Sequence, residues 1–225
     1  MSELIDKAKS ALQSADAILI GASNGLSISE GYNIFADNEM FRIQFGDFRT
    51  RYGIHSVLDG VFAKHMTAED HQEYMRRLVR LWTDEYTPMD VMTDLRAIVG
   101  DKPYFILTTN PDEHLEKAGF AHDAVWEIEG TLRDYFHGTN PQDKQPVLNA
   151  FLGQWSGKRL VILELGIGSR NRLIKLPLMQ LTMKLPQATY ITLNLAHEIY
   201  VPEEIAGKSI ALPGDIATTL KSLKG

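Results

Sequence analysis

The sequence predicts an α/β protein: a Rossmann-like parallel sheet flanked by helices, with a mostly helical insertion. Short apolar runs alternate with segments of helical period, and several of these runs end on glycine or on small polar residues. A chain of 225 residues with 44% hydrophobic content is long enough to bury one such domain around a substantial core.

A first helix is expected over residues 4–12, followed by a buried strand over residues 17–20 that runs into Gly21. Further strands are expected at 104–107, 160–163, 190–193 and 209–212, with 124–126 as a weaker sixth. Segments of helical period lie between them at 90–99, 112–118, 173–184 and 216–223. This alternation is typical of βαβ units, in which ligands bind at the carboxyl ends of the strands.

Two stretches interrupt the alternation. Residues 32–86 are expected to form a mostly helical insertion that caps the sheet, with a helix over 68–82. Residues 131–157 are rich in Gly, Pro, Asn and Gln and predict a smaller module with little regular structure. We therefore expect a single domain whose Rossmann-like part comprises residues 1–31 and 87–225.

Composition excludes several functions. The net charge of −6 gives no general reason to bind nucleic acid or anionic lipid. The chain has no cysteine, which excludes disulfides, thiolate catalysis and cysteine-ligated metal. No apolar run is long enough to span a membrane, and the amino terminus lacks the apolar core of a signal peptide. A cytoplasmic protein without membrane or nucleic-acid partners is expected.

Polar and glycine-rich motifs follow four of the predicted strands. The turn at residues 21–31 would let a backbone approach a pyrophosphate, or it is a tight packing turn. Asn110 and Asp112 would hold a carboxamide and a ribose, or cap the next helix. Glu127 and Glu129 would project to one side of an extended segment, or they are solvated surface charges. A second glycine turn lies at 166–168.

Taken in order, these motifs resemble those of the sirtuins over nearly the whole chain. Residues 23–35 echo the family's Gly-Ala-Gly-x-Ser-x-x-Ser-Gly-Ile-Pro-x-Phe, residues 108–112 its Thr-Gln-Asn-Ile-Asp, and residues 127–131 its Glu-x-His-Gly-Ser. Residues 166–169, 193–194 and 214–215 are similar to its later Gly-Thr-Ser, Ile-Asn and Gly-Asp elements. Within the family, residues 21–27 and 164–168 look most like the bacterial class M branch, which is linked to macrodomain proteins.

The resemblance implies a sirtuin-like, DHS-like NAD-binding fold and a function. That function is NAD-dependent protein ADP-ribosylation, in which the nicotinamide–ribose bond of the co-substrate NAD is cleaved and ADP-ribose passes to a protein acceptor. A lipoylated carrier protein is one candidate acceptor, and macrodomain proteins are candidate partners. Three alternatives stay open: a module that binds NAD or ADP-ribose without catalysis, an NAD hydrolase, and an NAD-dependent deacylase.

The resemblance also carries site residues over to this chain. It places Asn110, Asp112 and Glu129 in catalysis, the first two at the nicotinamide ribose and carboxamide. It assigns NAD binding to Gly21, Ala22, Ser23, Gly25, Leu26, Ser27, Asn110, Asp112, Gly166, Gly168, Ser169, Asn194, Asp215 and Ile216. Ser23, Gly25 and Ser27 would cradle the pyrophosphate, Gly166, Gly168 and Ser169 would support the adenosine half, and Asn194 would bind a ribose hydroxyl. Asp215 and Ile216 would flank the adenine.

This chain departs from the family pattern at three points. Glu129 stands where deacylating sirtuins carry a catalytic His, and an ordinary Glu pKa near 4.3 makes it a weaker base, which disfavours deacylation. The four zinc-binding cysteines of the family are missing, so no zinc is expected. Ala36 replaces the Arg that follows the Phe of the first motif.

Overall fold

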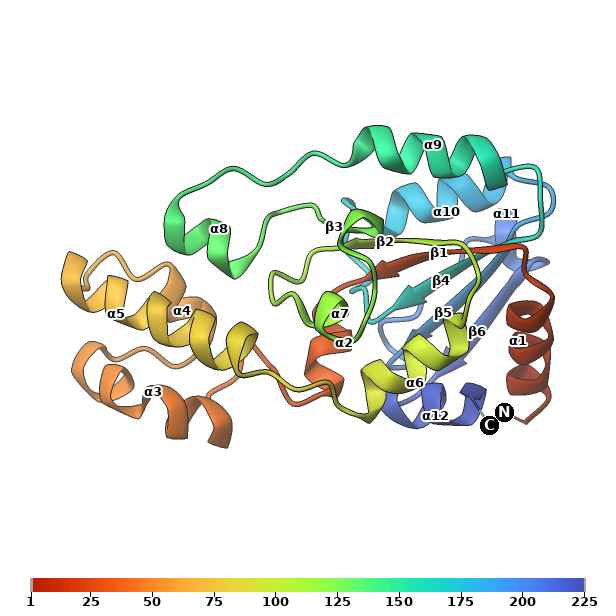
Figure 1. The fold of residues 1–225 in the computed structure, drawn as a ribbon. Coiled ribbons are helices and arrows are strands. Elements are labelled where there is room, and N and C mark those ends of the chain that lie inside the picture. The colour runs from red at the N-terminus through yellow and green to blue at the C-terminus, as the bar shows by residue number, and fades with distance from the viewer. Residues whose placement is uncertain (1, 225) are drawn as a thin grey trace.

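A six-stranded parallel sheet forms the centre of the protein (Figure 1), which we describe for residues 2–224 from a computed structural model. The strand order is β3-β2-β1-β4-β5-β6. The strands are β1 (Ala17–Ala22), β2 (Tyr104–Thr108), β3 (Val125–Glu127), β4 (Leu160–Leu165), β5 (Thr189–Asn194) and β6 (Ser209–Pro213). All six predicted strands, and the predicted Rossmann-like class, are therefore confirmed.

Helices cover both faces of this sheet (Figure 1). On one face lie α1 (Ser2–Ser14), α6 (Asp90–Val99) and α12 (Ile216–Lys224); on the other lie α9 (Gln145–Trp155), α10 (Lys175–Lys184) and α11 (Glu203–Ala206). Short helices follow two strand ends: α2 (Asn24–Ser29) after β1 and α7 (His114–Lys117) after β2. A 3₁₀ turn, His122–Ala124, precedes β3.

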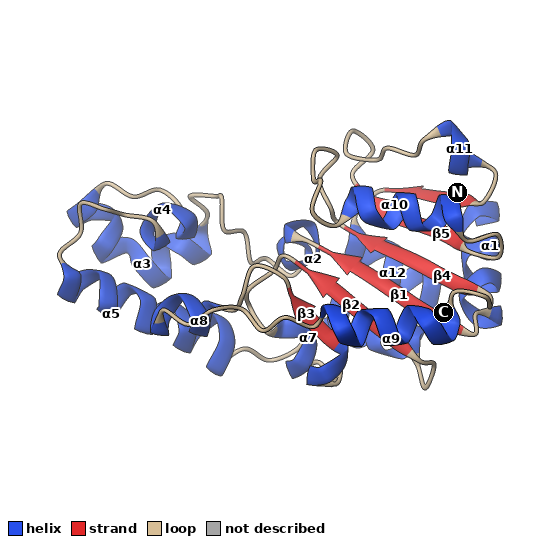
Figure 2. Cartoon of the chain, turned by 90° about the horizontal axis from the view of Figure 1, so that it is seen from above, coloured by secondary structure: helices blue, strands red, loops and turns tan. Residues whose placement is uncertain are grey.

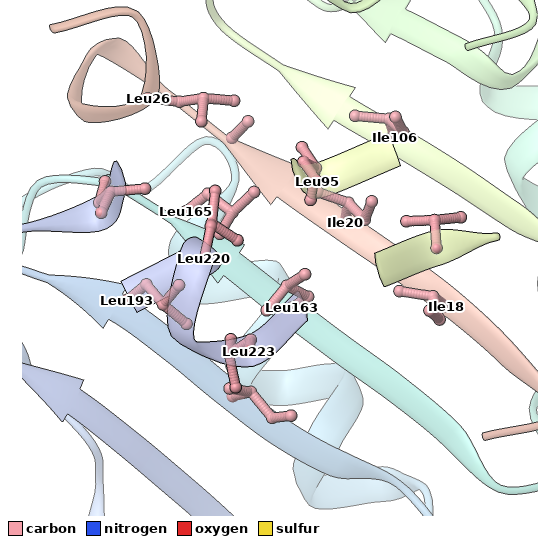
Figure 3. Close-up of a cluster of buried hydrophobic side chains, with 14 of the residues drawn as sticks. Ile18, Ile20, Leu26, Leu95, Ile106, Leu163, Leu165, Leu193, Leu220 and Leu223 are labelled. Atoms are coloured by element: carbon pink, nitrogen blue, oxygen red, sulfur yellow. The ribbon is translucent and has the colours of Figure 1, made fainter. Parts of the chain in front are cut away.

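Burial on both faces explains why the strands read as continuous apolar runs. Ile18 and Ile20 of β1 face the helices α6 and α12, whereas Leu19 packs on the opposite face. Figure 3 shows the first of these layers, in which Leu95 of α6 and Leu220 of α12 pack over the strands. The two layers hold the sheet rigid, and its carboxyl edge becomes a fixed platform for side chains.

The helical insertion lies beyond that carboxyl edge, toward which the strand arrowheads point (Figure 2). It contains α3 (Glu39–Tyr52), α4 (Val57–Val61) and α5 (Ala68–Val79), and it has a core of its own. Tyr74 is fully buried in this core and donates its hydroxyl proton to the carbonyl of Val57. The helix predicted over 68–82 ends as an α-helix at Val79 and continues as one π-helical turn, Arg80–Asp84.

The expectation of little regular structure over residues 131–157 is wrong. The segment forms α8 (Leu132–His137), which packs on the insertion, and α9, which packs on the sheet. The loop-forming composition is confined to the connection between them, and Pro146 is favoured in the first turn of α9 because its fixed φ suits a helix start. Leu148 and Leu152, one turn apart, then turn that helix toward the apolar sheet face.

The prediction that Glu127 and Glu129 project to one side is also wrong. Strand β3 ends at Glu127, and the N–H of Gly130 donates to the Glu127 carbonyl at 3.0 Å, which closes a turn. Gly130 has φ +91°, a left-handed backbone that glycine adopts without strain. Strand alternation therefore stops before Glu129, so Glu127 is buried while Glu129 is exposed.

Glu127 is buried beside a second carboxyl group. Burial, followed by the hydrogen bond and the charge of Glu116, raises the pKa of Glu127 to about 9. One buried oxygen of each carboxyl, Glu127 Oε1 and Glu116 Oε2, has no other partner among residues 2–224. The nearby ammonium of Lys144 is already bonded to the carbonyls of His122 and Val125. Glu127 therefore keeps its proton at neutral pH, which allows it to donate to Glu116.

The proton on Glu127 makes the free energy of unfolding depend on pH. The folded pKa of Glu127 lies above its ordinary value of 4.5, so the folded state holds the proton more tightly than the unfolded state does. Its contribution to stability is complete below pH 4.5 and is lost as the pH rises toward about 9. Glu127→Gln is expected to remove this loss of stability. The loss amounts to about 1.4 kcal/mol for each unit by which folding raises the pKa of Glu127.

The measurement is urea unfolding between pH 5 and 9, with Glu203→Gln, at an exposed position, as the control. The free energy of unfolding of Glu127→Gln should fall less steeply with pH than that of wild type or the control. Parallel curves for all three proteins would contradict the assignment.

Candidate active site

Two adjoining cavities lie at the carboxyl edge of the sheet. The larger, of about 520 Å³, lies over the ends of β1, β4, β5 and β6, and the smaller, of about 250 Å³, lies between the ends of β1 and β2 and the insertion. The larger is lined by Ser23, Asn24, Gly25, Ile28, Ser29, Phe35, Gly166, Gly168, Asn171, Asn194, Leu195, His197, Glu198, Gly214, Asp215 and Ile216. The smaller is lined by Asn24, Ile34, Phe35, Val57, Leu58, Val61, Phe62, Thr109, Pro111, Glu129, Leu132 and Tyr135. Asn24 and Phe35 line both, so the two cavities adjoin at these side chains, and we refer to the pair as the cleft.

The floor of the larger cavity is a close backbone contact between two glycine turns. The N–H of Gly25 donates to the carbonyl of Gly166 at 3.0 Å. A Cβ at Gly25 would lie 2.5 Å from Gly166 Cα, and Gly166 has φ +63°, so both positions require glycine. This contact joins the turn after β1 to the turn after β4 and sets the width of the cavity.

A chain of hydrogen bonds links three of the predicted site residues just beneath the cleft. Asn110 Nδ2 donates to Ser27 Oγ at 2.9 Å, and Ser27 Oγ donates to Asp112 Oδ2 at 2.6 Å. Asn110 Nδ2 also donates to the carbonyl of Ser23 at 3.1 Å. All three side chains are buried, and the sequence places Asn110 between Thr109 and Pro111, which line the smaller cavity.

The direction of this chain is fixed by its ends. The Asp112 carboxylate and the Ser23 carbonyl can only accept. Ser27 therefore donates its one hydroxyl proton to Asp112 and must accept from Asn110. The amide of Asn110 cannot be turned round without losing both of its bonds. Its oxygen, Oδ1, therefore faces the other way and has no hydrogen-bond partner among residues 2–224. Because its neighbours Thr109 and Pro111 line the smaller cavity, this buried acceptor is a candidate for contact with a ligand or a ligand-bound water.

The far wall of the larger cavity is formed by the loop after β5. Asn194 Nδ2 donates to the carbonyl of Ile167 at 2.9 Å, which ties this loop to the second glycine turn. Glu198 Oε2 accepts from the N–H of Ser169 at 2.7 Å. The hydrogen bonds from Ser169 lower the pKa of Glu198, so this wall carries a carboxylate.

A buried lysine braces the same two loops from below. Lys175 Nζ donates to Glu164 Oε1 at 2.8 Å, to the Ile167 carbonyl at 3.1 Å and to the Glu198 carbonyl at 3.4 Å. Burial raises the pKa of Glu164 although Lys175 lowers it, and the hydroxyl of Tyr190 donates to its other oxygen. These contacts give the cavity wall a fixed shape without lining the cavity themselves.

The structure brings most of the predicted site residues to the cleft. Those that line the larger cavity are Ser23, Gly25, Gly166, Gly168, Asn194, Asp215 and Ile216. Glu129 lines the smaller one, and Ser27, Asn110 and Asp112 form the layer beneath. Gly21, Ala22 and Leu26 line neither cavity and are packed in the core. Ser169 also lines neither cavity, and its N–H donates to Glu198.

Several cleft residues were missed by the sequence analysis. Glu198 and His197 follow β5 by only a few residues, and polar side chains past a strand end are candidates in any parallel sheet. Phe35 was noted only as part of a motif, yet it is the exposed side chain that both cavities share. A buried layer of Glu30, Tyr86 and His114 under Asp112 carried no signal in the sequence.

Residues 2–224 lack two further features. No three His, Asp or Glu side chains in that range lie together in a way that could hold a metal ion. No helix in that range is long and apolar enough to cross a membrane.

Comparison with known proteins points to one fold. A solved structure of Sir2 enzymes, described in terms of their mechanism and regulation, has a TM-score of 0.58 at 13% identity and covers 100% of this chain and 96% of its own. A second, described in terms of sirtuin substrate affinity, has a TM-score of 0.55 at 12% identity, covering 96% and 95%. The chain therefore has the fold of the sirtuins, as the sequence motifs led us to expect.

Two curated proteins are similar in sequence, while no family model matches the chain. "Protein ADP-ribosyltransferase" of Staphylococcus aureus strain Mu50 is 23% identical over 269 aligned positions, which cover 94% of this chain and 84% of that protein. "Prenylcysteine oxidase 1" of Mus musculus is 27% identical over 135 positions. That second match spans 60% of this chain and 24% of the mouse protein.

The contact between the glycine turns predicts the effect of one added methyl group. Gly25→Ala is expected to force the turns apart and to destabilise the protein by about 1–3 kcal/mol, since the new Cβ would meet backbone. The substitution should also lower the affinity for any ligand that binds in the larger cavity. Gly153→Ala is the matched control, because a Cβ there meets nothing within 4 Å, and it should leave stability unchanged or raised. Urea unfolding measures both, and equal stabilities would refute this contact.

Proposed function

We propose that the protein is an NAD-consuming enzyme of the sirtuin type that transfers ADP-ribose to a protein. The observation that carries this proposal is the cleft, in which a cavity of about 520 Å³ adjoins a smaller one directly above the Asn110–Ser27–Asp112 chain. The sirtuin fold and the similarity to a protein named for ADP-ribosyl transfer support it.

The cleft fits the parts of NAD in order. We infer that the larger cavity takes the adenosine half, with Asn194 near a ribose hydroxyl and Asp215 and Ile216 beside the adenine. Ser23 and Gly25, between the two halves, would lie along the pyrophosphate, where small residues permit close approach. The nicotinamide ribose would then lie at the smaller cavity, beside Glu129 and above Asn110.

The chemistry suits the charge at that end. When the bond between ribose C1′ and the nicotinamide nitrogen breaks, nicotinamide leaves with the electron pair and positive charge develops on the ribose. The carboxylate of Glu129 and the oxygen of Asn110 are the groups available to stabilise that charge, and Asp112 adds a negative potential from beneath. An acceptor nucleophile then bonds to C1′ and releases its proton to Glu129 or to water.

The smaller cavity offers a route for the acceptor. Phe62 and Tyr135 line it and are exposed, and their rings pack edge to face with centroids 6.5 Å apart. An acceptor side chain entering beside this ring pair would reach the ribose carbon past Glu129. A protein acceptor of the class M kind, such as a lipoylated carrier protein, and a macrodomain partner are part of this proposal.

Three alternatives remain: a deacylase and an NAD hydrolase, which also cleave the nicotinamide–ribose bond, and a binding module, which does not. Deacylation requires a base at the position of Glu129, and an exposed carboxylate is a weak one. Hydrolysis would use water as the acceptor, and a binding module would leave NAD intact. The products separate these cases, because transfer gives modified protein, hydrolysis gives free ADP-ribose, and binding gives no nicotinamide.

Nicotinamide release from NAD tests the role of the hydrogen-bonded amide. Asn110→Ala is expected to slow release by about 100-fold or more, because an oriented oxygen is lost from the reacting end. The affinity for ADP-ribose in calorimetry should change less than about threefold, since most contacts lie in the larger cavity. Asn149→Ala, an exposed position on α9, is the control. No release by wild type with any acceptor tried would contradict the proposed enzyme.

Glu129 is tested through its charge. Glu129→Gln keeps the shape of the side chain and removes the carboxylate, so nicotinamide release should fall by about tenfold or more while ADP-ribose binding persists. Rates are compared with those of Glu203→Gln, whose exposed site lies in α11. An unchanged release rate in Glu129→Gln would remove this residue from catalysis.

A further inference from the structure

A second buried layer lies under the hydrogen-bond chain, built from residues the proposed chemistry does not use. It consists of Glu30 at the end of α2, Tyr86 after the π-helical turn, and His114 at the start of α7. The side chains of Glu30 and His114 are 0% exposed. Tyr86 is stacked on the ring of His114 with centroids 3.5 Å apart, and Tyr32 packs against its edge.

The hydrogen bonds around His114 require an extra proton. Nε2 lies 2.8 Å from the carbonyl of Trp82, which can only accept. Nδ1 lies 3.2 Å from Glu30 Oε2, while Glu30 Oε1 accepts the proton of the Tyr86 hydroxyl at 2.7 Å. With Glu30 as a carboxylate, both ring nitrogens donate, and the ring is an imidazolium paired with Glu30. Burial lowers the pKa of His114, but Asp112, Glu30 and the Trp82 carbonyl together outweigh it and raise the pKa.

This buried cation lies next to the end of the hydrogen-bond chain. His114 Nδ1 is 3.8 Å from Asp112 Oδ2, the same oxygen that accepts from Ser27. The backbone N–H of His114 donates to Asp112 Oδ1 at 3.1 Å. The Asp112 carboxylate, which sets the direction of the chain, is thus balanced by the positive charge of His114. The other groups that face the His114 ring in this layer are Glu30, Tyr86 and Tyr32, and none of them supplies a positive charge.

We propose that Glu30, Tyr86 and His114 form a positioning unit that keeps Asp112 a pure acceptor and thereby fixes the orientation of Asn110. Without the imidazolium, the carboxyl groups of Asp112 and Glu30 would be buried together with no positive charge beside them, which is costly. Asp112 would then no longer be held as the acceptor of the Ser27 hydroxyl, so the Ser27 proton could point at Asn110 and the reason for one amide orientation would be gone. The unit therefore acts on the reaction through Asn110, and this inference rests on the proposed function.

A double-mutant cycle separates positioning from general structural support. Glu30→Gln and Tyr86→Phe are expected to slow nicotinamide release by about tenfold or more, with the affinity for ADP-ribose changed less than about threefold. In an Asn110→Ala background, the same two substitutions should slow nicotinamide release by less than about twofold more, because the Asn110 amide that they orient is no longer there. Equal effects in both backgrounds would overturn the proposal.

A matched control tests whether any buried hydroxyl would give this result. Tyr74→Phe removes the hydroxyl of another fully buried tyrosine, which donates to the Val57 carbonyl in the core of the insertion. It should destabilise the protein by about 1 kcal/mol and leave the rate of release unchanged. A loss of rate in Tyr74→Phe equal to that in Tyr86→Phe would also overturn the proposal.

The charge on His114 can be read without activity. Ring ¹⁵N chemical shifts of wild type should show both nitrogens protonated near pH 7, and Glu30→Gln should shift the ring toward its neutral form. A neutral His114 in wild type overturns the positioning unit whatever the activity. Absent nicotinamide release combined with a charged ring would instead overturn the proposed function and leave this layer as a structural one.

Discussion

The site depends on a short row of hydrogen bonds that can run in one direction only. Asp112 ends the row at one side and the Ser23 carbonyl at the other, and neither has a proton to give. Ser27 and Asn110 must therefore be oriented as they are, which leaves one buried amide oxygen without a partner among residues 2–224. In the proposed reaction, the ribose would need such an acceptor held in place before it arrives, because a group that must reorient during the reaction contributes less.

Distant parts of the fold meet to hold this row. The turn after β1 supplies Ser23 and Ser27, the end of β2 supplies Asn110 and Asp112, and the contact between Gly25 and Gly166 fixes the first turn against β4. The insertion contributes from beyond the sheet edge, since the Trp82 carbonyl comes from its π-helical turn and Tyr86 from the residues just after that turn. The insertion is therefore joined to the chemistry through a buried charged layer as well as through the cavity wall.

The sequence predicted the features that depend on local pattern. All six strands could be found because both faces of the sheet are buried, which makes each strand a continuous apolar run. The turn that separates Glu127 from Glu129 depends on the left-handed backbone of Gly130, and the start of α9 was obscured by the loop-forming residues before it. The layer around His114 could not be predicted, because its partners lie 84 and 32 residues away and one of them is a backbone carbonyl.

The most direct test of this account is a crystal structure of the wild-type protein with ADP-ribose. We expect adenosine in the cavity between Asn194 and Asp215, the pyrophosphate over the turn at Gly25, and the distal ribose within hydrogen-bond reach of Asn110 Oδ1, directly or through one water. Ligand bound elsewhere, or a distal ribose turned away from Asn110 with the Ser27–Asp112 bond broken, would contradict it.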